Sequence, residues 1–174
     1  MGIGYFRSFL VFCCVAAWST SALAGFEGDD AEKPWAEIEA QLPAYPRDEN
    51  LLAFFVSAAS DNKFMIDTES ISLGSDGVVR YTLVITSASG AKNVSYEGLR
   101  CLLAERRLYA FGRADKTWSK ARSQQWGKLK SPDMNRQHAV LYFEYFCPNG
   151  LTVRDAEEAR QALRAGSSSS SGMR

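Results

Sequence analysis

The chain has 174 residues, 20 basic and 20 acidic side chains, and a single histidine. This length suits one domain with a sizeable hydrophobic core, and a formal net charge of zero argues against a protein dedicated to nucleic acid. The charge is uneven, however: residues 25–50 hold eight acidic and two basic side chains, whereas residues 80–136 hold twelve basic and four acidic. The basic stretch either pairs with the acidic one or faces an anionic surface.

The first 24 residues have the pattern of an export signal. One charged residue, Arg7, precedes an apolar run from Phe9 to Trp18, and the segment ends in the A-x-A cleavage pattern Ala22-Leu23-Ala24. A run of about ten residues is too short for the roughly 20 that span a bilayer. We therefore predict a signal peptide over residues 1–24, whose removal leaves 19 basic and 20 acidic side chains in the mature chain.

Cleavage would also leave only two of the four cysteines, Cys101 and Cys147, because Cys13 and Cys14 lie in the leader. Neither leader cysteine follows the small residue that a lipidation site requires. In an oxidising compartment, an isolated cysteine pair predicts one structural disulfide, worth about 4 kcal/mol for a loop of this length. The alternatives are two free thiols, a redox pair or a metal pair. The chain lacks C-x-x-C, and it has too few soft ligands in a recognisable spacing for metal.

After the leader, composition divides the chain into three parts. Residues 25–33 are acidic and poor in large apolar side chains, so we expect this segment to be disordered. Residues 34–165 are expected to form a single α+β domain. Residues 166–174 contain five serines between glycines and predict a flexible tail.

A short helix is predicted at the start of the domain, from Pro34 to Gln41. Trp35, Ile38 and Leu42 recur at helical spacing, and proline suits a first helical position. Pro43 should end this helix, since the residue before a proline is pushed out of the helical region.

Strand patterns fill the middle of the chain. Apolar or β-branched runs predict strands near residues 51–57, 63–67, 70–73, 78–86, 93–103 and 107–112, with a shorter one at Trp118. The run Val78–Thr86 follows the turn signal Gly74-Ser75-Asp76-Gly77 and should form a hairpin with the strand after Ser89-Gly90.

The register of this hairpin can be predicted from its apolar residues. Pairing Tyr81 with Gly98 leaves room for the tyrosine ring. It also places one set of side chains on a common buried face: Val79, Tyr81, Leu83, Ile85, Val94 and Tyr96. In this register, Arg80 and Glu97 are diagonal neighbours on the opposite face.

Two helices are predicted after the strands. Residues 133–146 should be helical, with Ser131 as N-cap and Pro132 at the first position. The expected buried face of this helix consists of Ala139, Tyr142, Phe143 and Phe146. A strand over residues 140–146 remains the alternative. A last helix should run from Thr152 to Ala165 and pack at the edge through Val153, Ala156, Ala159 and Leu163. The expected fold is an antiparallel sheet of about five strands with helices near the two chain ends.

No residue pattern indicates a catalytic, cofactor or metal site. The one histidine, His138, lacks a recognisable nucleophile motif in the sequence. The candidate binding face is a basic and aromatic stretch suited to an anionic partner. Its members are Arg106, Arg107, Arg113, Lys116, Trp118, Lys120, Arg122 and Trp126. The alternative is that at least one tryptophan belongs to the core. Arg80, Glu97 and Arg100 form a second candidate, a polar patch, with a salt-bridged outer sheet face as the alternative.

Several motifs in the domain together resemble one protein family. They are Leu42-Pro43-Ala44-Tyr45-Pro46, Asp76-Gly77-Val78-Val79-Arg80-Tyr81, the run from Gly90 to Cys101, Trp118 with Trp126, and Phe146-Cys147-Pro148. They are similar to the CNP-one-like family of exported proteobacterial proteins, over about residues 35–154. The resemblance implies a location in the Gram-negative envelope and supplies no activity.

We therefore expect an exported periplasmic protein, with association to the outer membrane left open and without a stable transmembrane segment in the mature chain. The leading hypothesis is a non-catalytic binding or accessory module for a partner protein or an anionic glycan or lipid head group, with no nucleic acid and no cofactor. The alternative is a hydrolase-like enzyme acting on envelope material. A deep pocket with strongly shifted titratable groups would favour the enzyme, and a shallow basic and aromatic face would favour the binding module.

Overall fold

The computed structural model describes Met1 and residues 34–129 and 136–171. The expected signal peptide, the acidic segment 25–33 and the helix start at Ser131 and Pro132 lie outside these residues. Within residues 35–174, the described part of the chain forms one compact unit.

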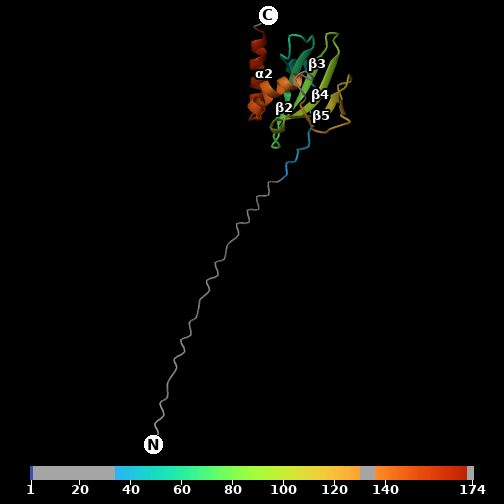
Figure 1. The fold of residues 1–174 in the computed structure, drawn as a ribbon. Helices are drawn as coiled ribbons and strands as arrows, with labels where there is room; N and C mark the ends of the chain where they lie inside the picture. The colour runs from blue at the N-terminus through green and yellow to red at the C-terminus, as the bar shows by residue number, and fades with distance from the viewer. Residues whose placement is uncertain (2–33, 130–135, 172–174) are drawn as a thin grey trace. The chain divides into compact units, whose positions relative to one another are not determined.

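The core of this unit is a seven-stranded antiparallel sheet (Figure 1). Its strands are β1 (Leu51–Phe54), β2 (Lys63–Leu73), β3 (Val78–Thr86), β4 (Lys92–Arg100), β5 (Glu105–Gly112), β6 (Trp118–Lys120) and β7 (Gly127–Lys128). They follow one another across the sheet in chain order, except that β6 and β7 pair with different parts of β5. The expected α+β class and antiparallel sheet are confirmed, with more strands than the five expected. One strand that the sequence did not predict is β7. It has only two residues, which is too short to show an alternating pattern of apolar side chains.

The predicted register of the central hairpin is wrong by one residue. Tyr81 opposes Glu97, and Gly98 opposes Arg80. Val94 and Tyr96 therefore lie on the opposite face from Tyr81, and Arg80 and Glu97 are on different faces. Both faces of this sheet are covered, so Tyr81 and Tyr96 are both buried, at 0% and 2% exposure. The prediction assumed that the apolar residues of both strands share one face, whereas Leu83 is buried on one face and Val94 and Tyr96 are buried on the other.

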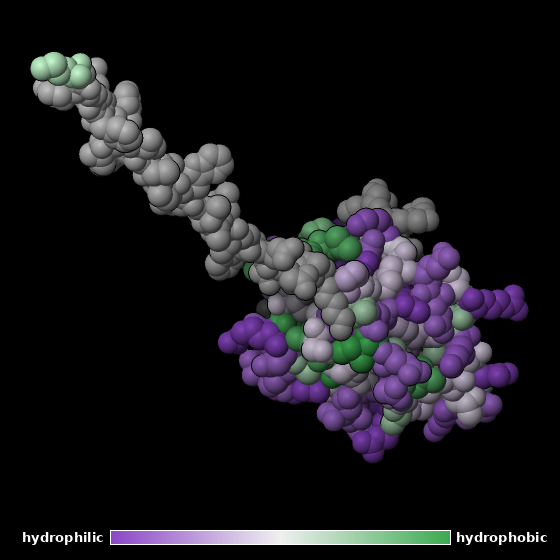
Figure 2. All heavy atoms as spheres, turned by 90° about the horizontal axis from the view of Figure 1, so that it is seen from below, coloured by the Kyte–Doolittle hydropathy of each residue, from purple (hydrophilic) through white to green (hydrophobic). Residues whose placement is uncertain are grey.

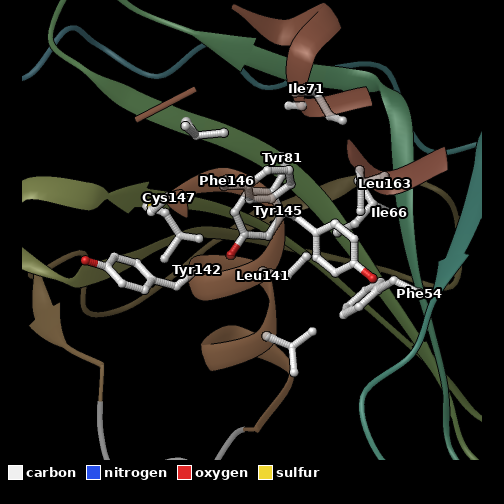
Figure 3. Close-up of a cluster of buried hydrophobic side chains, with 14 of the residues drawn as sticks. Phe54, Ile66, Ile71, Tyr81, Leu141, Tyr142, Tyr145, Phe146, Cys147 and Leu163 are labelled. Carbon is white, nitrogen blue, oxygen red and sulfur yellow. The ribbon is translucent and has the colours of Figure 1, made fainter. Parts of the chain in front are cut away.

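Helices cover one face of the sheet, which we call the helix face. Helix α1 (Arg136–Val140) continues into the π-helical turn η3 (Leu141–Phe146), and α2 (Ala156–Ser171) packs on β1, β2 and η3. Figure 3 shows the resulting aromatic contacts. The ring of Phe146 lies 5.1 Å from that of Tyr81, and the ring of Tyr145 lies 5.9 Å from that of Phe54.

The preference for helix over strand after residue 133 is confirmed for the described residues 136–146. Its predicted buried face is wrong in part, since Phe143 is 64% exposed whereas Leu141 and Tyr145 are buried. The cause is the wider π-helical turn, in which the Cys147 N–H donates to the Tyr142 carbonyl five residues earlier, at 2.9 Å. Leu141 and Phe146, five residues apart across this turn, are both fully buried, whereas Phe143 is directed to solvent.

Helix α2 differs from its prediction at both ends. It starts at Ala156, because the Asp155 carboxylate caps it by accepting the Glu158 N–H at 2.8 Å. It ends at Ser171, beyond the predicted end at Ala165. Gly166, the expected start of the tail, lies inside the helix against Tyr145, where an added Cβ would come within 2.5 Å of the hydroxyl oxygen. Ala159 and Leu163 are fully buried, as expected for its apolar side.

The predicted helix from Pro34 to Gln41 is absent, and residues 34–47 have no regular secondary structure. Helices near both chain ends are therefore a wrong expectation; among the described residues, the longer helical elements follow the sheet. Residues 35–47, which we call the N-terminal segment, lie on the second face of the sheet. The backbone groups of Ile38 bond to side chains of the sheet and its turn, Arg80 and Asp76, and not to neighbouring turns of a helix.

Candidate binding surfaces

The predicted disulfide between Cys101 and Cys147 is present, with a Cα–Cα distance of 5.4 Å. It joins the residue after β4 to the residue after η3, and both cysteines are buried. The Tyr142 hydroxyl also donates to the Cys101 carbonyl at 2.9 Å. The disulfide therefore ties the helical segment to the sheet.

The basic and aromatic stretch does not form one continuous face. Arg106 lies on the helix face, where its guanidinium is 3.3 Å from the Glu97 carboxylate. Arg107 and Trp126 bind Glu37 of the N-terminal segment, and the Trp118 indole N–H donates to the Pro43 carbonyl. The remaining cations of the stretch are exposed and make no ion pair within the described residues. They are Arg113, Lys116, Lys120 and Arg122.

Glu37 lies at the centre of a polar cluster on the second face, with its side chain only 13% exposed. Arg107 forms an ion pair with it, the Tyr109 hydroxyl donates to it at 2.5 Å, and the Trp126 indole N–H donates at 2.9 Å. Arg80 approaches the same carboxylate at 3.6 Å. We call Arg80, Arg107, Tyr109 and Trp126 the Glu37 cradle.

The turn before β3 holds Arg80 in position. The Asp76 carboxylate accepts two hydrogen bonds from the Arg80 guanidinium, at 2.6 and 3.2 Å. Burial raises the pKa of Asp76, but the hydrogen bonds from Arg80 and from the Ile38 and Val78 N–H groups outweigh it and hold the pKa below its usual value. Burial, followed by the hydrogen bond with Glu37, raises the pKa of Tyr109. The cradle thus keeps a protonated phenol and a charged guanidinium directed at one carboxylate.

Arg100 lies beside the cradle between two tryptophans. Its guanidinium carbon is 4.1 Å from the centre of the Trp35 ring and 5.1 Å from that of Trp126, and it pairs with Glu105. Such cation–π contacts favour Arg over Lys. The predicted polar patch is therefore divided: Arg80 and Arg100 are on the second face, and Glu97 is on the helix face.

Glu97 is a carboxylate on the helix face and is almost completely buried, at 3% exposure. Ser95 and Tyr81 donate hydrogen bonds to it at 2.7 and 3.2 Å. His138 Nε2 lies 2.9 Å from the Glu97 carboxylate. Burial raises the pKa of Glu97, but the charges and hydrogen bonds around it, His138 foremost, lower it to about 2.

This cluster does not have the arrangement of a hydrolytic triad. Its carboxylate stands between the serine and the histidine, whereas a triad places the histidine between nucleophile and carboxylate. Ser95 and His138 are also buried, at 7% and 6% exposure. Among the described residues, no group of three or more His, Cys, Asp and Glu side chains could hold a metal ion. No helix in residues 34–129 or 136–171 is long and apolar enough to cross a membrane.

A cleft of about 710 Å³ lies between the end of the N-terminal segment and the β5–β6 turn. Its lining includes four cations, Arg47, Lys92, Arg113 and Lys116, and two acids, Asp48 and Glu49. We call it the basic cleft. Lys92 pairs with Asp48 at 2.9 Å and Arg47 with Glu49 at 3.3 Å, which leaves Arg113 and Lys116 in excess.

Sequence reasoning did not single out Glu37 or the basic cleft. Glu37 lies 70 positions before its partner Arg107, and no local pattern marks so distant a pair. The sequence did indicate pairs of this kind through its uneven charge, which is acidic over residues 25–50 and basic over residues 80–136. These two stretches do pair within the molecule, through Glu37 with Arg107 and through Asp48 with Lys92.

No curated protein and no solved structure is significantly similar to this chain. The sequence model of one family, described as the CNP1-like family, matches residues 30–164. This match includes both the N-terminal segment and the sheet, and it agrees with the resemblance seen in the motifs. The chain belongs to the CNP1-like family.

Proposed function

We propose that the protein is an exported periplasmic binding module without catalytic activity, and that its basic cleft contacts an anionic component of the envelope. The component would be a glycan or lipid head group that carries phosphate or carboxylate groups. The A-x-A leader pattern and the disulfide support export, since disulfides persist in oxidising compartments.

The observation that carries this proposal is the excess of cations in the basic cleft, four against two carboxylates. Arg113 and Lys116 are exposed and make no ion pair in the part of the chain that the structure describes. Arginine recognises phosphate and carboxylate through a planar pair of donors, and lysine adds a point charge. A volume of about 710 Å³ is within the usual range for a small-molecule or head-group site.

The turn that carries these two cations is well ordered by its own hydrogen bonds. The Lys116 N–H donates to the Arg113 carbonyl at 3.0 Å, and the Arg113 N–H donates to the Thr117 carbonyl at 2.8 Å. The Asp115 carboxylate accepts from both the N–H and the hydroxyl of Thr117. The turn therefore presents both cations from a defined backbone, which reduces the entropy lost on binding.

Figure 2 shows hydrophilic side chains over most of one face of the domain, with smaller hydrophobic areas between them. A surface of this kind suits an electrostatic contact more than a large apolar interface. Exposed charges are screened beyond about 8 Å at physiological salt. We therefore expect binding that weakens as salt rises.

The test compares two charge-reversal variants of the mature protein. Arg113→Glu with Lys116→Glu changes the basic cleft, and Lys120→Glu with Arg122→Glu is the matched control from the same stretch. The probes are lipopolysaccharide and phosphatidylcholine vesicles with and without phosphatidylglycerol, measured by co-sedimentation at low and high salt. We expect the cleft variant to lose most binding to the anionic probes and the control to lose little. Equal binding by wild type and cleft variant would contradict the proposal.

A further inference from the structure

The second face of the sheet carries a second candidate site, which is centred on Glu37 and adjoins the basic cleft at residues 45–47. We propose that the Glu37 cradle recognises an extended acidic peptide segment of a partner protein, and that the chain's own N-terminal segment occupies this site in the structure. The recognised chemistry is a carboxylate two residues after an aromatic side chain, as in Trp35-Ala36-Glu37.

The first argument is the convergence of donors on one carboxylate. Arg80 comes from β3, Arg107 and Tyr109 come from β5, and Trp126 comes from the residues before β7. All four approach Glu37, with Tyr109 at 2.5 Å and Trp126 at 2.9 Å. Charge-assisted hydrogen bonds of this kind are stronger than neutral ones, and arginine is a common partner of a recognised carboxylate.

The second argument is that the sheet and its turn bind the backbone of the segment as well as its side chains. The Asp76 carboxylate accepts the Ile38 N–H at 2.9 Å, and the Arg80 guanidinium donates to the Ile38 carbonyl at 2.9 Å. Both backbone groups of one residue are thus bound by side chains, which requires an extended peptide but no particular side chain at that position. The Trp35 indole N–H likewise donates to the Asp76 carbonyl at 2.8 Å.

The third argument is that the segment fills the site incompletely. Residues 34–47 form no strand with the sheet, and Trp35, Ile38 and Leu42 stay 41–46% exposed. Two buried N–H groups of the cradle, Arg80 Nε and Arg107 Nε, have no acceptor within the described residues. A hollow of about 280 Å³ also remains beside the segment, lined in part by Arg107, Lys120 and Gln124.

A partner peptide must compete with a segment that is covalently attached. Such a segment acts at an effective concentration in the millimolar range, so the wild-type protein should bind a free peptide weakly. Weakening the chain's own contacts should expose the cradle without changing it. Glu37→Gln removes the charge at the centre of the cradle, and Trp35→Ala removes the ring that packs on Arg100 and Trp126.

The experiment measures binding of a fluorescent peptide to the full mature protein by anisotropy. The peptide has the sequence of residues 34–44, so it ends before the residues that line the basic cleft. The variant Trp35→Ala/Glu37→Gln should bind the peptide at least about tenfold more tightly than wild type, a difference of about 1.4 kcal/mol. Adding Arg107→Gln to this variant should abolish the gain. Adding Arg113→Glu and Lys116→Glu should leave it unchanged, which separates this site from the basic cleft.

Two results would overturn the inference. One is a folded, disulfide-bonded variant that binds the peptide no better than wild type. The other is equal binding of a peptide in which the position of Glu37 holds glutamine. If the double variant fails to fold, peptide binding is measured with the single variant Glu37→Gln, because glutamine keeps the size of the side chain. The same two results would then overturn the inference.

Discussion

The buried carboxylate of Glu97 should make a large and pH-dependent contribution to stability. It is 3% exposed and surrounded by Ser95, Tyr81, Arg106 and His138. Its pKa falls from 4.5 to about 2 in the folded protein. At about 1.4 kcal/mol per pH unit, this difference corresponds to about 3 kcal/mol. Glu97→Gln should therefore lower the free energy of unfolding by about 3 kcal/mol at pH 7.

The sign of the pH dependence follows from the lowered pKa. An acid that is stronger in the folded state stabilises the protein fully above its unfolded pKa, near 4.5, and loses this effect as pH falls towards about 2. The difference in stability between wild type and Glu97→Gln should thus be larger at pH 7 than at pH 4 or 3.

Urea unfolding followed by tryptophan fluorescence at pH 7, 4 and 3 measures this difference. Glu39→Gln is the matched control, since Glu39 is exposed and its change should cost under about 0.5 kcal/mol. A Glu97→Gln variant as stable as wild type at pH 7 would refute the reasoning. So would a destabilisation that stays the same at every pH.

Three further predictions concern the covalent and steric features of the fold. Thiol titration of the unreduced mature protein should find no free thiol, and Cys101→Ser with Cys147→Ser should lower stability by about 4 kcal/mol for a separation of 46 positions. Gly98→Ala should destabilise by about 1–3 kcal/mol, because its Cβ would lie 2.6 Å from the Tyr109 hydroxyl oxygen; Gly127→Ala, with nothing within 4 Å, should be neutral in thermal unfolding. Asp76→Asn should cost about 1–3 kcal/mol in urea unfolding, because it removes the charge that holds the buried Arg80.

Local chemistry was sufficient to predict several parts of this fold. The β-branched run Val78–Thr86 forms β3 with the predicted bounds. The predicted turn at residues 74–77 lies directly before this strand and joins it to β2. Cys101 and Cys147 form the predicted disulfide. The strand and the turn depend on residues that are neighbours in the sequence, and the disulfide follows from the number of cysteines. A single sequence supplies both kinds of information.

The parts that failed depend on contacts across the molecule. The hairpin register was undetermined because the helices cover one face and the N-terminal segment covers the other. The helical spacing of Trp35, Ile38 and Leu42 was real, but bonds from Asp76 and Arg80 to the backbone of Ile38 hold this segment extended. Arg107 and Trp126 looked free for a ligand because their partner, Glu37, is distant in sequence.

The central claim, that an anionic component binds in the basic cleft, can be tested most directly by locating the contact. Backbone amide NMR shifts of the mature protein should be followed during titration with a short phosphorylated oligosaccharide at low salt. The account predicts that the largest changes fall on residues 45, 47–49, 90–92 and 112–116, and that they disappear in Arg113→Glu/Lys116→Glu. Changes confined to other parts of the sheet, or the same changes in the variant, would contradict it.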